Sequence, residues 1–144
     1  MPGPLYCDSS ALLKLYLSEA GSDELNRIVE GRVDLLVPDL AVSEIVSALA
    51  RRLRQGALTP EAARRIQHAI LGGIDSGVFQ NVELTRDVHR RAEHFLLTLR
   101  ETPLRAADAL HLALATVARA ASIASFDIRL TAAARAVGLA TYPP

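Results

Sequence analysis

Residues 5–16 read LYCDSSALLKLY, and this stretch decides the fold. It opens with a short apolar run, turns polar at Asp8-Ser9-Ser10, and then places apolar residues at helical spacing. The stretch therefore predicts a short buried strand that leads directly into a helix. Such a unit is typical of α/β proteins built on a parallel sheet.

The same alternation continues along the chain. Further strands are expected at 33–37, where Pro38 closes the strand, and at 78–82, 122–125 and 139–142. Helices are expected near 25–29, over 40–55, from 60 to a break at Gly72-Gly73, over 85–99, over 104–118 and over 128–137. We therefore expect one α/β domain over residues 1–144, with a central parallel sheet of four to five strands and helices on both faces.

Composition narrows the class of protein. Half of the residues are hydrophobic and 22% are charged, which is ordinary for a globular chain and excludes a disordered one. Cys7 is the only cysteine, so a disulfide framework is excluded, and four scattered histidines predict no zinc cluster. No apolar run approaches the ~18–20 residues of a membrane span and no leader peptide is evident, so we expect a cytoplasmic protein without membrane contact.

The balanced charge hides an uneven distribution. Sixteen basic residues face sixteen acidic ones, yet residues 1–50 carry three basic and eight acidic groups, and residues 51–105 carry ten and six. A protein that holds nucleic acid through bulk charge is usually clearly basic. Any nucleic-acid role is therefore expected to depend on local patches and on a specific site.

Four acidic residues stand where a parallel sheet binds ligands. Asp8 follows the first expected strand and Asp127 the fourth, at the edge where strands end. Glu44 has small neighbours on its helix, and Asp108 lies in an apolar helix where an unpaired carboxylate is costly. Structural alternatives remain open: the two strand-end acids could cap helices, Glu44 could be solvent-exposed, and Asp108 could pair with Arg105.

These four carboxylates can converge at one edge of one sheet. Two carboxylates ~5 Å apart at an effective dielectric constant of ~20 repel by roughly 3 kcal/mol, so four require a cation or protons. Oxygen ligands favour a hard ion such as Mg²⁺ or Mn²⁺. Such an ion binds phosphate oxygens and lowers the pKa of water, which indicates phosphodiester hydrolysis.

At these residues the chain resembles the PIN-domain ribonucleases and, within them, the VapC toxins of bacterial and archaeal toxin-antitoxin pairs. The resemblance covers essentially the whole chain and rests on four segments in order: YCDSSALLKLY at 6–16, VSEIVSAL at 42–49, ADALHLA at 107–113 and SFD at 125–127. Each segment alone is weak, and the four in this order form a strong signal. The resemblance implies a single PIN-like domain.

The resemblance also implies an activity. The chain would be a Mg²⁺-dependent endoribonuclease, with Mn²⁺ as a substitute, and the toxin of a type II toxin-antitoxin system. Its catalytic and metal-binding residues would be Asp8, Glu44, Asp108 and Asp127, with the hydroxyls of Ser10 and Ser125 orienting the site. Metal-activated water would cleave RNA to leave a 5′-phosphate and a 3′-hydroxyl. A homodimer is implied, held in check by a cognate antitoxin whose C-terminal segment occupies the acidic groove.

Another class of function stays open. A non-catalytic PIN-like module could bind RNA or a partner without cutting, and the metal dependence of cleavage would discriminate the two. His111, one turn from Asp108, could contact that acid or RNA, or simply pack the helix. The arginines could bind RNA or the antitoxin, or form solvated helix faces; they are Arg51, Arg52, Arg54, Arg64, Arg65, Arg86, Arg90 and Arg91. Cys7 is expected to be a buried strand residue, and Lys14 could meet a phosphate.

Overall fold

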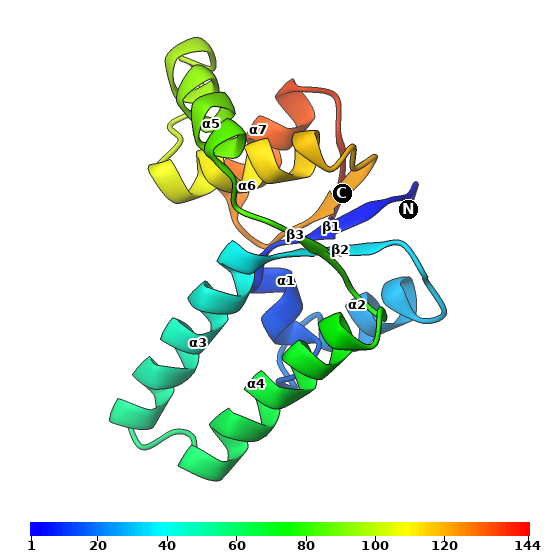
Figure 1. Ribbon diagram of the computed structural model, residues 1–144, viewed down its shortest axis with the longest axis vertical. Helices are drawn as coiled ribbons and strands as arrows, with labels where there is room; N and C mark the ends of the chain where they lie inside the picture. Colours follow the sequence, from blue (N-terminus) through cyan, green and yellow to red (C-terminus); the bar gives the residue numbers. More distant parts are fainter.

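The computed structural model describes all 144 residues, with strands and helices alternating along most of the chain (Figure 1). The strands are β1 (Leu5–Cys7), β2 (Leu35–Pro38), β3 (Gln80–Val82), β4 (Ser122–Ala124) and β5 (Ala140–Tyr142). The helices are α1 (Ser9–Lys14), α2 (Ser22–Val29), α3 (Asp39–Arg54), α4 (Pro60–Asp75), α5 (Arg86–Thr98), α6 (Ala106–Val117) and α7 (Ile128–Ala136).

The five strands form one parallel sheet in the order β3-β2-β1-β4-β5, which confirms the predicted α/β architecture. The chain builds outward from β1 through β2 to β3, and then returns to add β4 and β5 on the other side. The order therefore reverses between β1 and β4. Ligands of open parallel sheets bind at the strand ends beside such a reversal.

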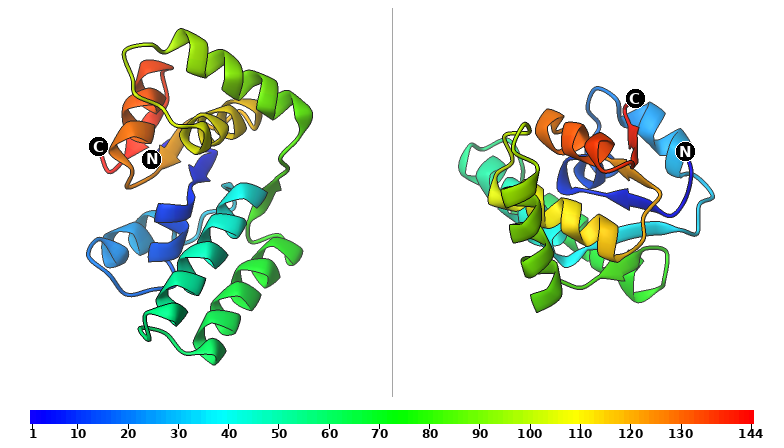
Figure 2. Two further views of the ribbon diagram at one scale, coloured as in Figure 1. Left: turned by 90° about the vertical axis from the view of Figure 1, so that its left-hand side faces the viewer. Right: turned by 90° about the horizontal axis from the view of Figure 1, so that it is seen from above.

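Helices cover both faces of the sheet, as predicted (Figures 1 and 2). One core packs α1 to α4 against the sheet, and the other packs α5, α6 and α7 against the opposite face. The strand residues alternate between the two cores: Leu5 and Cys7 belong to the first, and Tyr6 between them belongs to the second. The thiol of Cys7 is buried as predicted, and burial raises its pKa to about 12.

The predicted break at Gly72-Gly73 is wrong, because α4 continues through both glycines to Asp75. A Cβ atom at residue 73 would lie 2.7 Å from the Phe79 ring, so Gly73 leaves room for that ring to pack against the helix. Gly77, with a φ of +82°, then turns the chain toward β3. The glycine pair thus serves packing inside the helix.

The later strands are each one or two residues shorter at one end than predicted, with the largest differences at β2 and β3. Strand β2 ends at Pro38, as predicted, but it begins at Leu35 instead of Val33, and α3 follows directly at Asp39. Strand β3 begins at Gln80 instead of Val78, and Phe79 just before it packs into the core on the side of α3 and α4. No helix of the chain is both long and apolar enough to cross a membrane.

Candidate active site

Asp8 lies at the end of the central strand β1, beside the reversal in strand order. Its side chain accepts a hydrogen bond from the backbone N–H of Ala11 at 2.9 Å and so caps α1. The residue is only 3% exposed. Burial raises the pKa of this carboxyl above its usual value, although hydrogen bonds from Ser125, Ala11 and Ser10 and the nearby His111 oppose the rise.

Two serine hydroxyls hold the Asp8 carboxylate. Ser10 donates to Oδ1 at 2.7 Å and Ser125 donates to Oδ2. Ser10 Oγ also accepts from the backbone N–H of Phe126, and Ser125 Oγ accepts from that of Asp127 at 3.1 Å. The predicted serines therefore tie the end of β1 to the end of β4.

Asp127 follows β4 and caps α7, accepting from the backbone N–H of Arg129 at 2.8 Å and of Leu130 at 3.3 Å through Oδ1. The capping alternative is thus correct for both strand-end acids. Capping leaves Oδ2 of Asp127 outside these bonds, and it lies 3.9 Å from Nη2 of Arg105. Capping and ligand binding are therefore compatible at this residue.

Asp108 is buried in the first turn of α6, where it pairs with Arg105, the structural alternative considered from the sequence. The backbone N–H of Arg105 donates to Oδ2 at 3.0 Å, and Nε of the same arginine lies 3.7 Å from that oxygen. The Arg105 side chain is 69% exposed, so both its contacts to carboxylates lie at the rim of the site. This arginine stands between Asp108 and Asp127.

Glu44 projects from the second turn of α3 and meets His111 of α6. Its Oε1 is hydrogen-bonded to Nε2 of His111, while Nδ1 of His111 is 2.7 Å from the hydroxyl of Tyr6. Burial, followed by the charges of Asp8 and Glu44, raises the pKa of Tyr6 well above its usual value. Tyr6 therefore stays protonated, and the His111 ring bridges its hydroxyl to the Glu44 carboxylate.

Contacts thus join three of the predicted acids, Asp8, Asp127 and Asp108, into one network at the end of the sheet, and Glu44 is held separately by His111 of α6. Ser125 links Asp8 to Asp127, Arg105 links Asp127 to Asp108, and His111 reaches Glu44 from one turn beyond Asp108. The acids are joined mainly through these intermediates. No three acidic, histidine or cysteine side chains are gathered closely enough to hold a metal ion in this arrangement.

Sequence reasoning missed the roles of three residues in this network. Tyr6 has no sequence signal beyond its place in an apolar strand, and the alternatives considered for His111 are packing, Asp108 and RNA, none of which is Glu44. His111 is buried as packing requires, and it also holds Glu44. Arg105 was considered only as a partner of Asp108, whereas it reaches Asp127 as well. The three-residue spacing predicts the contact with Asp108, but no spacing rule predicts the contact with Asp127.

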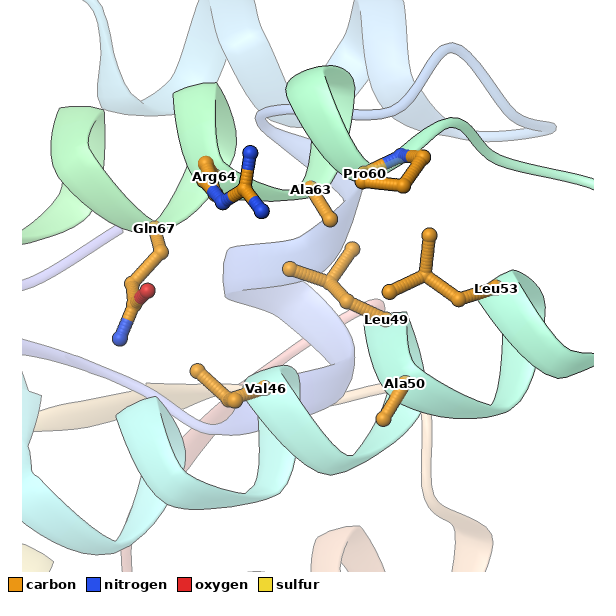
Figure 3. A pocket seen from close by; sticks show the side chains of 8 residues that line it. All are labelled: Val46, Leu49, Ala50, Leu53, Pro60, Ala63, Arg64 and Gln67. Carbon is orange, nitrogen blue, oxygen red and sulfur yellow. The ribbon is translucent and has the colours of Figure 1, made fainter.

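A second, apolar feature lies away from these acids. The helices α3 and α4 form a hairpin, and a groove of about 190 Å³ runs between them (Figure 3). Five of its eight lining residues are hydrophobic, including Leu49 and Leu53 of α3 and Ala63 of α4. The groove offers no acid, so its chemistry differs from that of the network.

Comparisons with known proteins show the family to which the chain belongs. A family model described as "PIN domain" matches residues 5–136. The curated protein "Ribonuclease VapC45" of Mycobacterium tuberculosis (strain CDC 1551 / Oshkosh) is 34% identical over 142 residues, which cover 96% of this chain and 94% of that protein. "Ribonuclease VapC46" of Mycobacterium tuberculosis (strain ATCC 25618 / H37Rv) is 30% identical over 142 residues and 97% of each chain.

Solved structures share the fold. The crystal structure of Mycobacterium tuberculosis VapC20, described as a sarcin-ricin loop cleaving toxin, superposes with a TM-score of 0.72 at 20% identity, covering 90% of this chain and 94% of that one. FitAcB from Neisseria gonorrhoeae gives a TM-score of 0.72 at 13% identity, covering 96% of each chain.

Proposed function

Because the chain belongs to the PIN domain family, we propose that it is a VapC-type toxin that cleaves RNA with the help of a divalent cation. Asp8, Glu44, Asp108 and Asp127 would hold the cation, which is Mg²⁺ with Mn²⁺ as a substitute. One observation carries the proposal: Asp8, Asp127 and Asp108 are joined by contacts beside the reversal in strand order, and Glu44 is hydrogen-bonded to His111 on the helix that carries Asp108. The ribonuclease names of relatives at 30–34% identity support the same chemistry.

The residues present fit a hard cation. The donors are carboxylate oxygens, which suit Mg²⁺ and Mn²⁺. Asp8 is buried with a raised pKa, and its direct partners are hydroxyl and backbone N–H groups, so no cationic group contacts its carboxylate. A bound divalent cation would supply a positive charge there, activate water and neutralise phosphate oxygens.

The chain's own residues orient the site. Ser10 and Ser125 fix both oxygens of Asp8, and His111 fixes Glu44. Arg105 is exposed and bound only weakly, so its guanidinium can leave the two carboxylates and take a phosphate oxygen of the RNA. The serines and His111 therefore act by positioning acids, and Arg105 acts toward the substrate.

The family also suggests the setting in which the protein works. We propose that it acts in the cytoplasm as a homodimer and that a cognate antitoxin restrains it, with the antitoxin's C-terminal segment in the acidic groove. Expression with and without the adjacent open reading frame tests the restraint. Growth arrest and new RNA ends are expected only when the neighbouring frame is absent.

Removal of the cation tests the proposed function directly. The purified protein should cleave RNA in a mixture of transfer and ribosomal RNA when Mg²⁺ or Mn²⁺ is present, and it should lose this activity in EDTA. The products should carry 5′-phosphates, which sequencing of the RNA ends with and without phosphatase detects. Binding of the same RNA without cleavage under any divalent cation would instead support a non-catalytic RNA-binding module.

Arg105 and a divalent cation should compete for the same carboxylates. The variant Arg105→Ala is expected to bind Mn²⁺ about threefold more tightly, because it removes a weak, exposed ion pair worth ~0.2–1 kcal/mol. Isothermal titration without RNA measures this affinity. Arg54→Ala, which removes an exposed arginine at the end of α3, is the control and should leave the affinity unchanged. Weaker binding by Arg105→Ala would contradict competition.

A further inference from the structure

Arg119 has a backbone conformation that L-amino acids rarely adopt. Its φ is +57°, and the other five residues with positive φ are all glycines. Arg119 follows the end of α6, where its N–H bonds to the carbonyl of Thr116 and the N–H of Ala120 bonds to that of Ala115. Glycine is the residue that usually ends a helix in this way, because it avoids the clash of Cβ with the backbone.

Nothing inside the fold accounts for an arginine there. The side chain is exposed and forms no ion pair or hydrogen bond within the chain. The negative end of the α6 dipole attracts a cation, but water and salt screen that attraction at an exposed site. Its backbone conformation and its free charge therefore make Arg119 a candidate for binding a ligand.

The helices α5 and α6 pack against each other (Figure 1). The Arg119 side chain lines a hollow of about 770 Å³ between α5 and the end of α6. We call it the basic hollow. Its other lining residues are Asp87, Arg90, Arg91 and His94 of α5 and Thr116 and Val117 of α6. Arg90 pairs with Glu93, whereas Arg91 and Arg119 have no acidic partner. Asp87 also lines the hollow and has no ion pair, so its carboxylate offsets part of this charge, and three arginines against one carboxylate leave the lining net positive.

The hollow is separate from the acidic network. Asp108 lies in the first turn of α6 and Arg119 lies just beyond its last residue. The helix has 12 residues, which at 1.5 Å per residue is about 18 Å. A ligand that occupies both places must therefore be extended and carry several negative charges.

We propose that the basic hollow binds backbone phosphates of RNA at a distance from the cleavage site; this rests on the proposed function in taking RNA as the ligand. Guanidinium groups bind phosphate through paired hydrogen bonds. Only one of the seven lining residues is hydrophobic. Protein interfaces have an apolar centre, whereas nucleic-acid interfaces are polar and positively charged, so the lining favours RNA over an acidic protein.

The first test measures RNA binding without cleavage. The probe is a fluorescein-labelled 20-nucleotide oligouridylate in EDTA, and fluorescence anisotropy is recorded over a salt series. The double variant Arg91→Ala/Arg119→Gly should bind about tenfold or more weakly at low salt, and the slope of log K against log[salt] should fall by about 1.4, or 0.7 per lost phosphate contact. The control Arg27→Ala/Arg54→Ala, with the same loss of charge on the α1–α4 side, should change affinity less than threefold.

The second measurement separates binding from folding. Arg119→Gly alone should keep or raise the melting temperature, because glycine suits the conformation, while RNA affinity falls. A lower melting temperature would overturn the proposal, since the arginine would then serve the fold. An equal loss of affinity in the control pair would also overturn it, in favour of bulk charge.

Two further outcomes complete the design. Polyglutamate is the probe for an acidic protein partner. If the double variant loses polyglutamate binding while its RNA affinity is unchanged, the proposal is overturned in favour of an acidic protein. Cleavage by the wild-type chain in Mg²⁺ is measured separately. If the wild-type chain cleaves RNA but the double variant binds RNA as tightly as the wild type, only this inference is overturned. If RNA binding depends on the basic hollow but the wild-type chain does not cleave, only the proposed cleavage is overturned.

Discussion

The variant Asp8→Asn is expected to lower RNA cleavage by about 10³-fold or more, while the protein stays folded. Asparagine has the shape of aspartate and keeps an oxygen to accept from Ala11 and Ser10, but it lacks the negative charge that a cation needs. Cleavage of labelled RNA in Mg²⁺ gives the rate, and circular dichroism confirms the fold. Asp75→Asn at the exposed end of α4 is the matched control. Undiminished cleavage by Asp8→Asn would contradict the proposed site.

The same variant should melt a few degrees higher than the wild type at pH 7 in EDTA. The folded-state pKa of Asp8 is raised by burial, so the folded chain favours the protonated carboxyl. Stability from this group is therefore fully present below its unfolded pKa and is lost as the pH rises through the raised folded pKa. Because asparagine is neutral at every pH, its advantage should shrink as the solution is acidified toward pH 4. Melting scans from pH 4 to pH 7 test this, and a difference independent of pH would argue against the raised pKa.

The variant His111→Ala is expected to lower the free energy of unfolding by about 3 kcal/mol. It leaves a cavity and strips the buried hydroxyl of Tyr6 of its only hydrogen-bond partner. Glu44 also loses the imidazole that holds it, so we expect cleavage to fall by a further ~10–100-fold at temperatures where the variant is folded. Urea unfolding and cleavage at a low temperature measure the two effects.

Tyr6→Phe serves as the milder companion, since it removes one hydroxyl and keeps the ring. It should cost about 1 kcal/mol and leave Glu44 bound to His111. Cleavage by folded His111→Ala at the wild-type rate would show that His111 only fills space.

Much of the fold could be predicted from local patterns. The apolar run at residues 5–7 predicts a strand, and the helical spacing of apolar residues after it predicts a helix, because both patterns depend on neighbours in sequence. The continuation of α4 through Gly73 could not be predicted, since it depends on Phe79 packing against the helix after the chain has turned back. Local rules fail where a tertiary contact overrides them.

The site divides in the same way. The four candidate acids could be selected because strand ends of a parallel sheet share one edge and a carboxylate in an apolar helix is unusual, and their order along the chain carried the family resemblance. The Tyr6 to His111 bond spans 105 positions and the His111 to Glu44 bond spans 67, so no spacing rule connects them. Sequence thus identified the charged groups and could not identify what holds Glu44 in place.

The three-residue strand β1 has a mechanical consequence. Its side chains lie alternately in the two cores, and Asp8 directly follows its last residue. Neither group of helices can separate from the sheet without exposing a residue of this strand. The two halves are therefore coupled into one cooperative unit, and any loosening of that unit would reach the acidic network in the same event.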